Sequence, residues 1–227
     1  MNLEKYGAVI FDLFHTLTSA DVLRVPGKGT SEILGVGRDD WNNQLLLHSE
    51  DRLRGKITDP FVIIEKMAHA IDPAIPQETI REAVNSRIER FRQALVNIEE
   101  STLVALQKLR QSGKSLGLVS NADVNEISGW DQSPLKPYFK SVVFSCRVGY
   151  VKPEKEIYEL ALKQLNAMPG DVLYVGDGGS DELMGAQRVG MHTVLTVHVI
   201  KQFWPDRIVK ARAHADYEID RIEELVI

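Results

Sequence analysis

The stretch Tyr6-Gly7-Ala8-Val9-Ile10-Phe11 is a short apolar run, and the carboxylate residue Asp12 follows it directly. A run that is apolar at nearly every position, rather than at alternate ones, predicts a strand buried on both faces, as in a parallel sheet. Four later stretches show the same character: residues 115–119, 141–145, 172–175 and 193–197. A last edge strand is expected at residues 215–219.

Helical patterns separate the predicted strands. Leucines recur at helical spacing in residues 102–110, and Gly113 supplies a stop signal after them. A second helix is expected to open at Pro153, and a third to span residues 181–189. Strands that alternate with helices of this length predict βαβ units. We therefore expect an α/β fold whose core is a doubly wound, Rossmann-like parallel sheet.

The stretch of residues 19–97 has a different pattern. It lacks convincing buried strands, and its longer segments, residues 41–53 and 78–91, are helical and amphipathic. We expect an α-helical cap domain over residues 19–97, inserted into a core formed by residues 1–18 and 98–227.

The composition is that of an ordinary globular protein, with 44% hydrophobic and 26% charged residues. The formal net charge of −5 argues against nucleic acid or an anionic membrane as the main partner. No apolar run approaches the ~20 residues that a membrane-spanning helix needs. The single cysteine, Cys146, cannot form an internal disulfide, and no signal segment opens the chain, so we expect a cytoplasmic protein.

Four of the predicted strands end in a polar or charged cluster. In an open parallel sheet, ligands bind just beyond the carboxyl ends of the strands. Because these strand ends lie along one sheet edge, we expect their polar side chains to form one site. The residues concerned are Asp12 with Thr16, Ser120 with Asn121, Lys152, and Asp177 with Asp181.

These residue types suit phosphate chemistry. Asp12 and Asp177 offer hard oxygen ligands, which favour Mg²⁺, and two facing carboxylates would repel each other without a cation between them. Lys152 offers a compact positive charge for an anionic substrate. Ser120 and the backbone N–H groups near it are suited to hold phosphoryl oxygens.

The four clusters, in this order and spacing, resemble those of the haloacid dehalogenase-like hydrolase superfamily, in the branch whose helical cap follows the first motif. The resemblance implies that the Asp12 carboxylate is the catalytic nucleophile and that Thr16 supports it. It also implies that Ser120 and Asn121 bind the transferred phosphoryl group. Lys152 would then neutralise charge.

The same resemblance implies a magnesium site. Asp12 and Asp177 would bind the ion directly, and Asp181 would lie in its outer sphere or reach it through water. The backbone carbonyl of Phe14 would be a further ligand, which does not depend on the side chain. The implied reaction is hydrolysis of a small phosphorylated metabolite through an aspartyl-phosphate intermediate.

Position 14 departs from the family pattern. Phosphatases of the superfamily normally carry a second aspartate two residues after the nucleophile, as general acid and base, and here that residue is Phe14. General acid–base catalysis is typically worth ~10²–10⁴ in rate. The adjacent His15 has a suitable ordinary pKa to replace it, although a loop contact also explains this residue.

Two other readings follow from Phe14. A 2-haloacid dehalogenase needs no such acid, and Tyr158 matches a dehalogenase position, but it also falls on the apolar stripe of its helix. Dehalogenases also replace the acid at the position of Asp177, which favours the metal-dependent reading. A phosphonate-cleaving relative would need a cap lysine, and only Lys56 and Lys66 lie well inside the cap.

The remaining alternative is a binding or regulatory protein on a catalytically weakened scaffold. The loss of the acid–base residue supports it, whereas retention of Asp12, Lys152 and Asp177 argues for an enzyme. We therefore favour a magnesium-dependent phosphatase.

Overall fold

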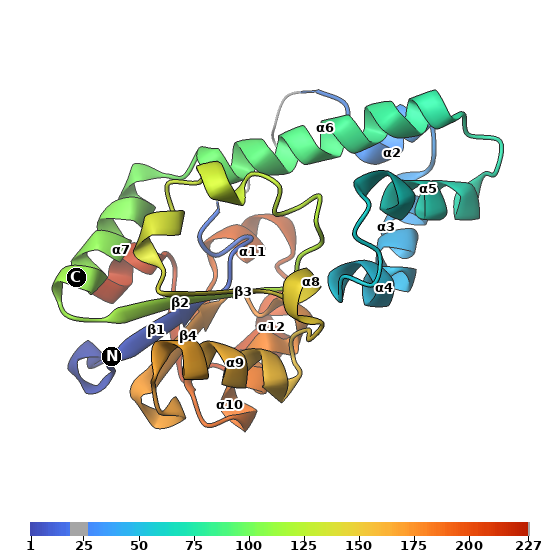
Figure 1. Ribbon diagram of the computed structural model, residues 1–227. Coiled ribbons are helices and arrows are strands. Elements are labelled where there is room, and N and C mark those ends of the chain that lie inside the picture. Colours follow the sequence, from blue (N-terminus) through green and yellow to red (C-terminus); the bar gives the residue numbers. More distant parts are fainter. Residues whose placement is uncertain (19–26, 227) are drawn as a thin grey trace.

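The computed structural model describes residues 1–18 and 27–226, and its centre is a six-stranded sheet with the order β3-β2-β1-β4-β5-β6 (Figure 1). All neighbouring strands are parallel. The strands are β1 (Ala8–Phe11), β2 (Ser115–Ser120), β3 (Ser141–Phe144), β4 (Val172–Gly176), β5 (His192–Thr196) and β6 (Tyr217–Ile219). Strand β1 lies in the interior of the sheet, which explains why its residues are buried on both faces.

Helices cover both faces of the sheet. Val9 and Phe11 pack into an apolar cluster with helix α7 (Glu100–Gln111) and the 3-10 turn η6 (Ile222–Val226). On the other face Ala8 and Ile10 pack into a second cluster. That cluster includes α9 (Lys155–Leu165), α10 (Glu182–Arg188), α11 (His198–Phe203) and α12 (Arg207–Arg212). The predicted doubly wound α/β fold is confirmed.

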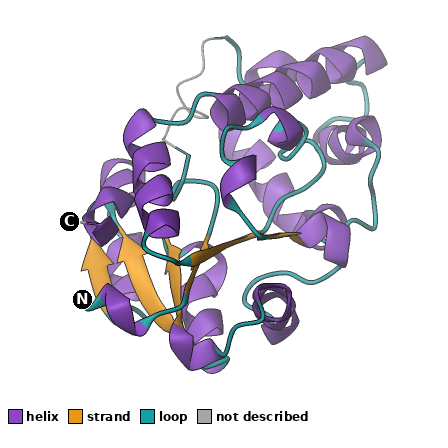
Figure 2. Ribbon diagram, turned by 60° about the vertical axis from the view of Figure 1, so that its left-hand side comes forward, coloured by secondary structure: helices purple, strands orange, loops and turns teal. Residues whose placement is uncertain are grey.

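A separate helical lobe lies beside the sheet (Figures 1 and 2). It consists of α2 (Thr30–Leu34), α3 (Arg38–Leu47), α4 (Ser49–Leu53), α5 (Pro60–Ile71) and α6 (Gln77–Val96). These helices bury an apolar cluster of their own, centred on residues such as Trp41, Ile64 and Ile80. The long helix α6 runs from above the sheet out to the lobe (Figure 1). The domain boundaries at residues 18/19 and 97/98 stay a prediction, and residues 19–26 lie outside the described part.

Short elements complete the chain. Helix α8 (Ser145–Val148) follows β3, and 3-10 turns occur at Leu3–Lys5 (η1), Trp130–Gln132 (η2), Lys136–Tyr138 (η3), Pro169–Asp171 (η4) and Gly179–Asp181 (η5). No helix in the described ranges has the length and apolar character needed to cross a membrane.

Two sequence-based expectations need adjustment. The helix expected over residues 41–53 is two helices, α3 and α4, which meet at His48. Leu46 and Leu47 are largely exposed there, so no continuous apolar stripe held one straight helix together. The strand expected over residues 141–145 ends at Phe144, and Ser145 and the buried Cys146 already belong to α8.

Candidate active site

The Asp12 carboxylate lies just beyond the end of β1 and is 6% exposed. Its backbone N–H donates to the carbonyl of Val175 (2.9 Å), which extends the pairing of β1 with β4 by one residue. The Thr16 hydroxyl donates to Oδ2 of Asp12 (3.1 Å), and Lys152 Nζ donates to Oδ1 (2.5 Å). Both oxygens therefore have a partner that fixes the plane of the carboxylate. Thr16, expected to support Asp12, thus contacts its carboxylate directly.

Lys152 is held by its backbone as well as by its side chain. Its N–H donates to Oδ1 of Asn121 (2.7 Å), and Nδ2 of Asn121 donates to the Lys152 carbonyl (3.0 Å). Both ends of the Asn121 amide are therefore engaged with the Lys152 peptide. The structure thus gives the Asn121 side chain a positioning function. Contact with a phosphoryl group, which we expected from the sequence, would fall to its backbone.

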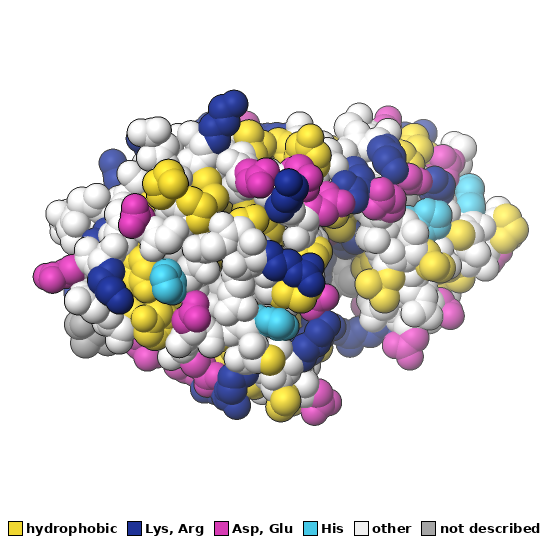
Figure 3. Space-filling model, turned by 90° about the horizontal axis from the view of Figure 1, so that it is seen from below, with side chains coloured by type: hydrophobic (Ala, Val, Ile, Leu, Met, Phe, Trp, Pro, Cys, Tyr) yellow, Lys and Arg dark blue, Asp and Glu magenta, His cyan; other side chains and the backbone are white. Residues whose placement is uncertain are grey.

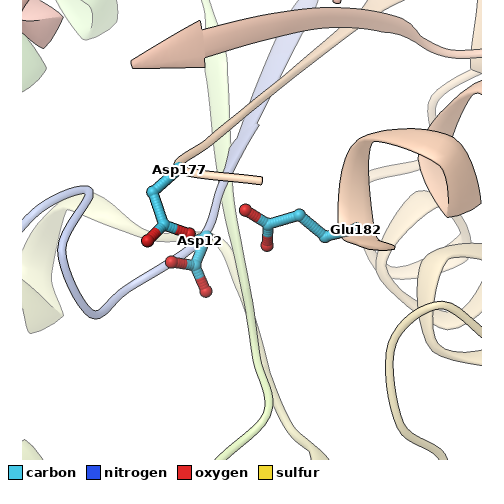
Figure 4. Close-up of side chains that lie close together, drawn as sticks. All are labelled: Asp12, Asp177 and Glu182. Atoms are coloured by element: carbon cyan, nitrogen blue, oxygen red, sulfur yellow. The ribbon is translucent and has the colours of Figure 1, made fainter. Parts of the chain in front are cut away.

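Three carboxylates come together around the predicted metal position (Figure 4). Asp12, Asp177 and Glu182 each have an oxygen within 4.8 Å of the others. Asp177 follows β4, whereas Glu182 is the first residue of α10. We call these three residues and Lys152 the site cluster.

Glu182 was not predicted from the sequence. Its carboxylate accepts from the Tyr174 hydroxyl (2.8 Å), from the Gly178 N–H (3.0 Å) and from Lys152 Nζ. It also lies across the backbone of Gly176, where an added Cβ would stand 2.1 Å from Oε1. A glycine at 176 is therefore needed for Glu182 to reach the site. The only signal in the sequence is its place beside Asp181 in an acidic run.

Asp181 itself is not in the site. Its carboxylate is 41% exposed and pairs with Lys210 of α12 at 2.6 Å. Ser180 and Asp181 both adopt left-handed backbone angles (φ 55° and 50°), and α10 begins only at Glu182. This geometry turns the Asp181 side chain outward and directs the next side chain inward. The prediction of Asp181 as a metal-site residue is corrected to Glu182.

The pKa values reflect this crowding. Burial raises the pKa of Asp12, although the Lys152 ammonium opposes the shift. Burial and the charge of Asp12 together raise the pKa of Glu182 to about 8. Burial alone would raise the pKa of Asp177, but the neighbouring His15 ring holds it below its ordinary value. Two of the acidic groups, Asp12 and Glu182, thus share one buried ammonium, and the third, Asp177, lies beside them.

This donor set fits a hard divalent cation. Carboxylate oxygens are the ligands that Mg²⁺ prefers, and a cation between the three acids would relieve their mutual repulsion. Asp12, Asp177 and Glu182 are the side chains that would hold it. Phe14, expected to contribute its carbonyl, lies two residues beyond Asp12 in the same loop.

The Ser120 hydroxyl is a buried polar group that a bound ligand could satisfy. Its side chain ends β2, is 1% exposed, and its Oγ has no hydrogen-bond partner within the described residues. A buried hydroxyl without a partner costs about 1–3 kcal/mol in desolvation. A phosphoryl oxygen bound at this strand end could accept a hydrogen bond from the hydroxyl. The phosphoryl-binding role expected for Ser120 stays a prediction.

Phe14, His15 and Tyr158, the residues on which the alternative readings depend, each have a defined contact in the structure. The Phe14 ring packs edge-on against Phe91 of α6, with centroids 5.3 Å apart, so it joins the core to the helical lobe. His15 Nδ1 lies 3.7 Å from Oδ2 of Asp177, and its ring contacts Trp204. The Tyr158 hydroxyl donates to the backbone carbonyl of Glu182 (2.9 Å) in the core, which explains this residue by packing.

A cleft of about 670 Å³ lies between the lobe and the core. Helices α3 and α4 line one wall, and Lys152, Asn121 and Trp204 belong to the other. Figure 3 shows the hollow between the larger body and the smaller lobe, with Lys and Arg side chains around it.

Buried ion pairs connect the lobe to the core at this cleft. Arg52 Nη1 donates to Asp123 (2.9 Å) and lies 3.4 Å from Glu126, and Arg87 donates to Glu126 (2.6 Å). These four residues form the lobe–core cluster. Arg54 adds a bidentate pair with Glu154, two residues after Lys152. The lobe is therefore docked against the loop that carries Lys152.

The sequence pattern of the haloacid dehalogenase-like hydrolases matches residues 6–190, which is most of the chain. The protein belongs to this family. Members of the haloacid dehalogenase-like family are hydrolases. All four residues of the site cluster lie within the matched residues.

Several relatives of this hydrolase are named phosphatases. The pyrophosphatase PpaX of Bacillus mycoides is 30% identical over 226 residues, which cover 98% of this chain and 96% of the relative. The glyceraldehyde 3-phosphate phosphatase of Methanocaldococcus jannaschii is 28% identical over 136 residues, 59% of this chain and 57% of that protein. Bifunctional epoxide hydrolase 2 of Rattus norvegicus is 33% identical over 114 residues, 47% of this chain. The match thus spans just over half of the second relative and 20% of the third.

Solved structures show the same fold. A crystal structure of a dehalogenase superposes with a TM-score of 0.68 at 20% identity, covering 97% of this chain and 95% of that one. A phosphatase of the family from Thermococcus onnurineus superposes with a TM-score of 0.62 at 23% identity, covering 96% and 95%. The two enzymes differ in chemistry, so the fold alone does not select the reaction.

Proposed function

We propose that this hydrolase is a magnesium-dependent phosphatase that acts on a small phosphorylated metabolite through an aspartyl-phosphate on Asp12. The site cluster carries the proposal, because the buried carboxylates of Asp12 and Glu182 share the single ammonium of Lys152 and the half-buried carboxylate of Asp177 lies beside them. A dehalogenase has no use for this excess of acidic oxygen ligands. The relatives named as phosphatases support the same choice.

The residues have defined tasks in this reaction. A carboxylate oxygen of Asp12 attacks phosphorus, the bond from phosphorus to the leaving oxygen breaks, and water later hydrolyses the acyl phosphate. The Ser120 hydroxyl donates to a phosphoryl oxygen, and Lys152 balances negative charge at the nucleophile. Thr16 holds the carboxylate plane during the attack. Magnesium, when bound to the site cluster, would neutralise charge on the phosphoryl group.

Replacing the nucleophile tests the proposal. Asp12→Asn keeps the size of the side chain but removes the attacking charge, so turnover of phosphate monoesters should fall by roughly 10⁴-fold or more. The assay is phosphate release in Mg²⁺, with circular dichroism to show that the fold is retained. A parallel screen with 2-haloacids in chelator tests the dehalogenase reading. Near-normal activity of a folded Asp12→Asn protein would refute the proposal, and no activity on any substrate would favour a binding protein.

Phe14 makes the leaving group decisive. Its ring cannot transfer a proton and is packed against Phe91, so an alkoxide must leave without protonation from this position. An aryl or acyl phosphate has a more acidic leaving group and should lose much less. We therefore expect faster turnover of aryl phosphates than of alkyl phosphates.

Restoring an acid at this position tests that expectation. Phe14→Asp should raise turnover of alkyl phosphates, up to the ~10²–10⁴ that acid–base catalysis supplies, and raise aryl phosphate turnover less. Phe14→Leu is the matched control, because it also removes the ring contact with Phe91 but adds no acid. Equal effects of the two substitutions would show that only packing changed, and would make His15 the next residue to replace.

A further inference from the structure

The cleft between the lobe and the core is lined by four cationic side chains: Arg38, Arg52, Lys152 and Arg207. Two of them are already neutralised. Arg52 is paired in the lobe–core cluster, and Lys152 is paired in the site cluster. Arg38 and Arg207 have no acidic partner within the described residues. They are thus the lining cations whose charge is left for a ligand.

The acidic residues of the cleft do not cancel this charge. Glu50 and Glu126 also line it, but each is engaged elsewhere. Glu50 pairs with Arg54 at 2.6 Å and with Lys56 at 3.3 Å, and Glu126 belongs to the lobe–core cluster. The lining of the cleft therefore keeps a net positive charge, which comes from Arg38 and Arg207.

Arg207 is connected to the site cluster by a chain of ring contacts. Its guanidinium lies over the Trp204 ring, 5.0 Å from the centroid, and Trp204 meets the His15 ring edge-on at 4.9 Å. His15 in turn lies beside Asp177, at 3.7 Å. A guanidinium stacked on an aromatic face keeps its N–H donors available in the plane of the group. Arg207 thus lines the same cleft as Lys152, and its contact with Trp204 leaves its N–H donors available for a ligand.

Arg38 stands on the opposite wall, as the first residue of α3. Residues 19–54 of the helical segment contain four arginines, Arg24, Arg38, Arg52 and Arg54. The structure separates them, because Arg52 and Arg54 are used in ion pairs and Arg24 lies outside the described residues. Among the described arginines of residues 19–54, Arg38 is the one without an acidic partner, so its charge is available to a ligand.

We propose that Arg38 and Arg207 form a second anion subsite, so that the substrate is a phosphate monoester with another anionic group at its far end. That group is a carboxylate or a second phosphate. The inference rests on the proposed phosphatase function for the position of the first phosphate. A cleft of about 670 Å³ is within the usual range for small-molecule sites, roughly 300–1,000 Å³. A substrate that spans both arginines would also join the lobe wall to the core wall.

Matched aryl phosphates test the subsite, because their leaving groups are acidic enough to depart without help from position 14. The pair is 4-(carboxymethyl)phenyl phosphate and 4-(carbamoylmethyl)phenyl phosphate, which differ in one negative charge but hardly in shape. We expect kcat/KM to favour the carboxylate by about tenfold or more in the wild type. A third compound, 4-(phosphonomethyl)phenyl phosphate, shows whether a second phosphate-like group is preferred over a carboxylate.

Variants assign the preference to the two arginines. Arg207→Gln and Arg38→Gln should each reduce the carboxylate-to-carboxamide ratio of kcat/KM several-fold, and the double variant should bring it close to one. Arg188→Gln is the matched control, since Arg188 is exposed on α10 and does not line the cleft, and it should keep the wild-type ratio. A wild-type ratio near one, or a ratio that survives the double variant, would overturn the subsite.

Binding measurements keep the subsite and the phosphatase function distinguishable. Calorimetry with the corresponding benzylphosphonates, in which a methylene replaces the ester oxygen, reports binding whether or not hydrolysis occurs. Preference for the carboxylate form, lost in the double variant, with no hydrolysis of any ester would support the subsite and refute the phosphatase. Equal binding of the two phosphonates beside measurable hydrolysis would refute the subsite alone.

Discussion

Two buried clusters of charged side chains lie close to the cleft, and they differ in their balance of charge. The site cluster has three carboxylates and one ammonium, whereas the lobe–core cluster has two carboxylates and two guanidinium groups. Both are removed from water, so each uncompensated charge is expensive. The balanced cluster is complete as a structural contact. The unbalanced one needs a further cation, which is the property expected of a metal site.

The hydrogen bonds of the lobe–core cluster show the same completeness. Asp123 accepts from the backbone N–H groups of Asn125 (2.9 Å) and Glu126 (3.2 Å), in addition to its pairing with Arg52. Burial and the charge of Asp123 nevertheless raise the pKa of Glu126, despite the two arginines. A raised pKa therefore occurs in both clusters. The count of opposite charges, not the pKa shift, separates the site cluster, which we propose to be functional, from the lobe–core cluster.

In the comparison of the two clusters, the largest effect is expected from replacing a proposed metal ligand of the site cluster. Asp177→Asn should lower phosphatase turnover by at least ~10²-fold, as loss of one electrostatic contributor commonly does. Mg²⁺ should raise the thermal unfolding temperature of the wild type, since a ligand at 100 times its Kd stabilises by about 2.7 kcal/mol. That rise should be absent in Asp177→Asn and present in Glu126→Gln. An undiminished Mg²⁺ response in Asp177→Asn would place the metal elsewhere.

A smaller but distinct effect is expected from unbalancing the lobe–core cluster. Glu126→Gln removes one of two acids, so Arg87 loses its acidic partner and Arg52 keeps only Asp123. Breaking a buried pair in this way typically lowers the free energy of unfolding by about 3–5 kcal/mol. Urea denaturation of the metal-free protein measures it. A loss below about 1 kcal/mol would show that the cluster is more hydrated than its burial indicates.

The smallest effect is expected from the same substitution in the site cluster. Glu182→Gln removes an acid from a group that already lacks cations, so the free energy of unfolding of the metal-free protein should fall by less than about 1 kcal/mol, or rise. A Gln oxygen in the place of Oε2 can still accept from the Tyr174 hydroxyl, whereas the Gly178 N–H loses Oε1 as its acceptor. Removal of the repulsion between the acids offsets that loss. Urea denaturation beside Glu126→Gln makes the comparison direct. Equal losses for the two variants would remove the distinction drawn between the clusters.

The sequence by itself predicted the sheet and the positions of Asp12, Ser120, Lys152 and Asp177 at its carboxyl edge. These predictions depend on local patterns, because a continuous apolar run followed by a polar residue marks the end of a buried parallel strand. Chain order then brings the strand ends to one edge. For these residues the position along the element was enough to place the side chain.

Only the tertiary structure decided which acidic residue turns inward beyond β4 and which arginines remain available. Glu182 replaces Asp181 because two left-handed residues shift the start of α10, and the room for its carboxylate comes from Gly176. Arg207 is available and Arg52 is not, because their neighbours come from distant parts of the chain. Side-chain direction and ion pairing depend on such non-local contacts, which no spacing within a segment of sequence specifies.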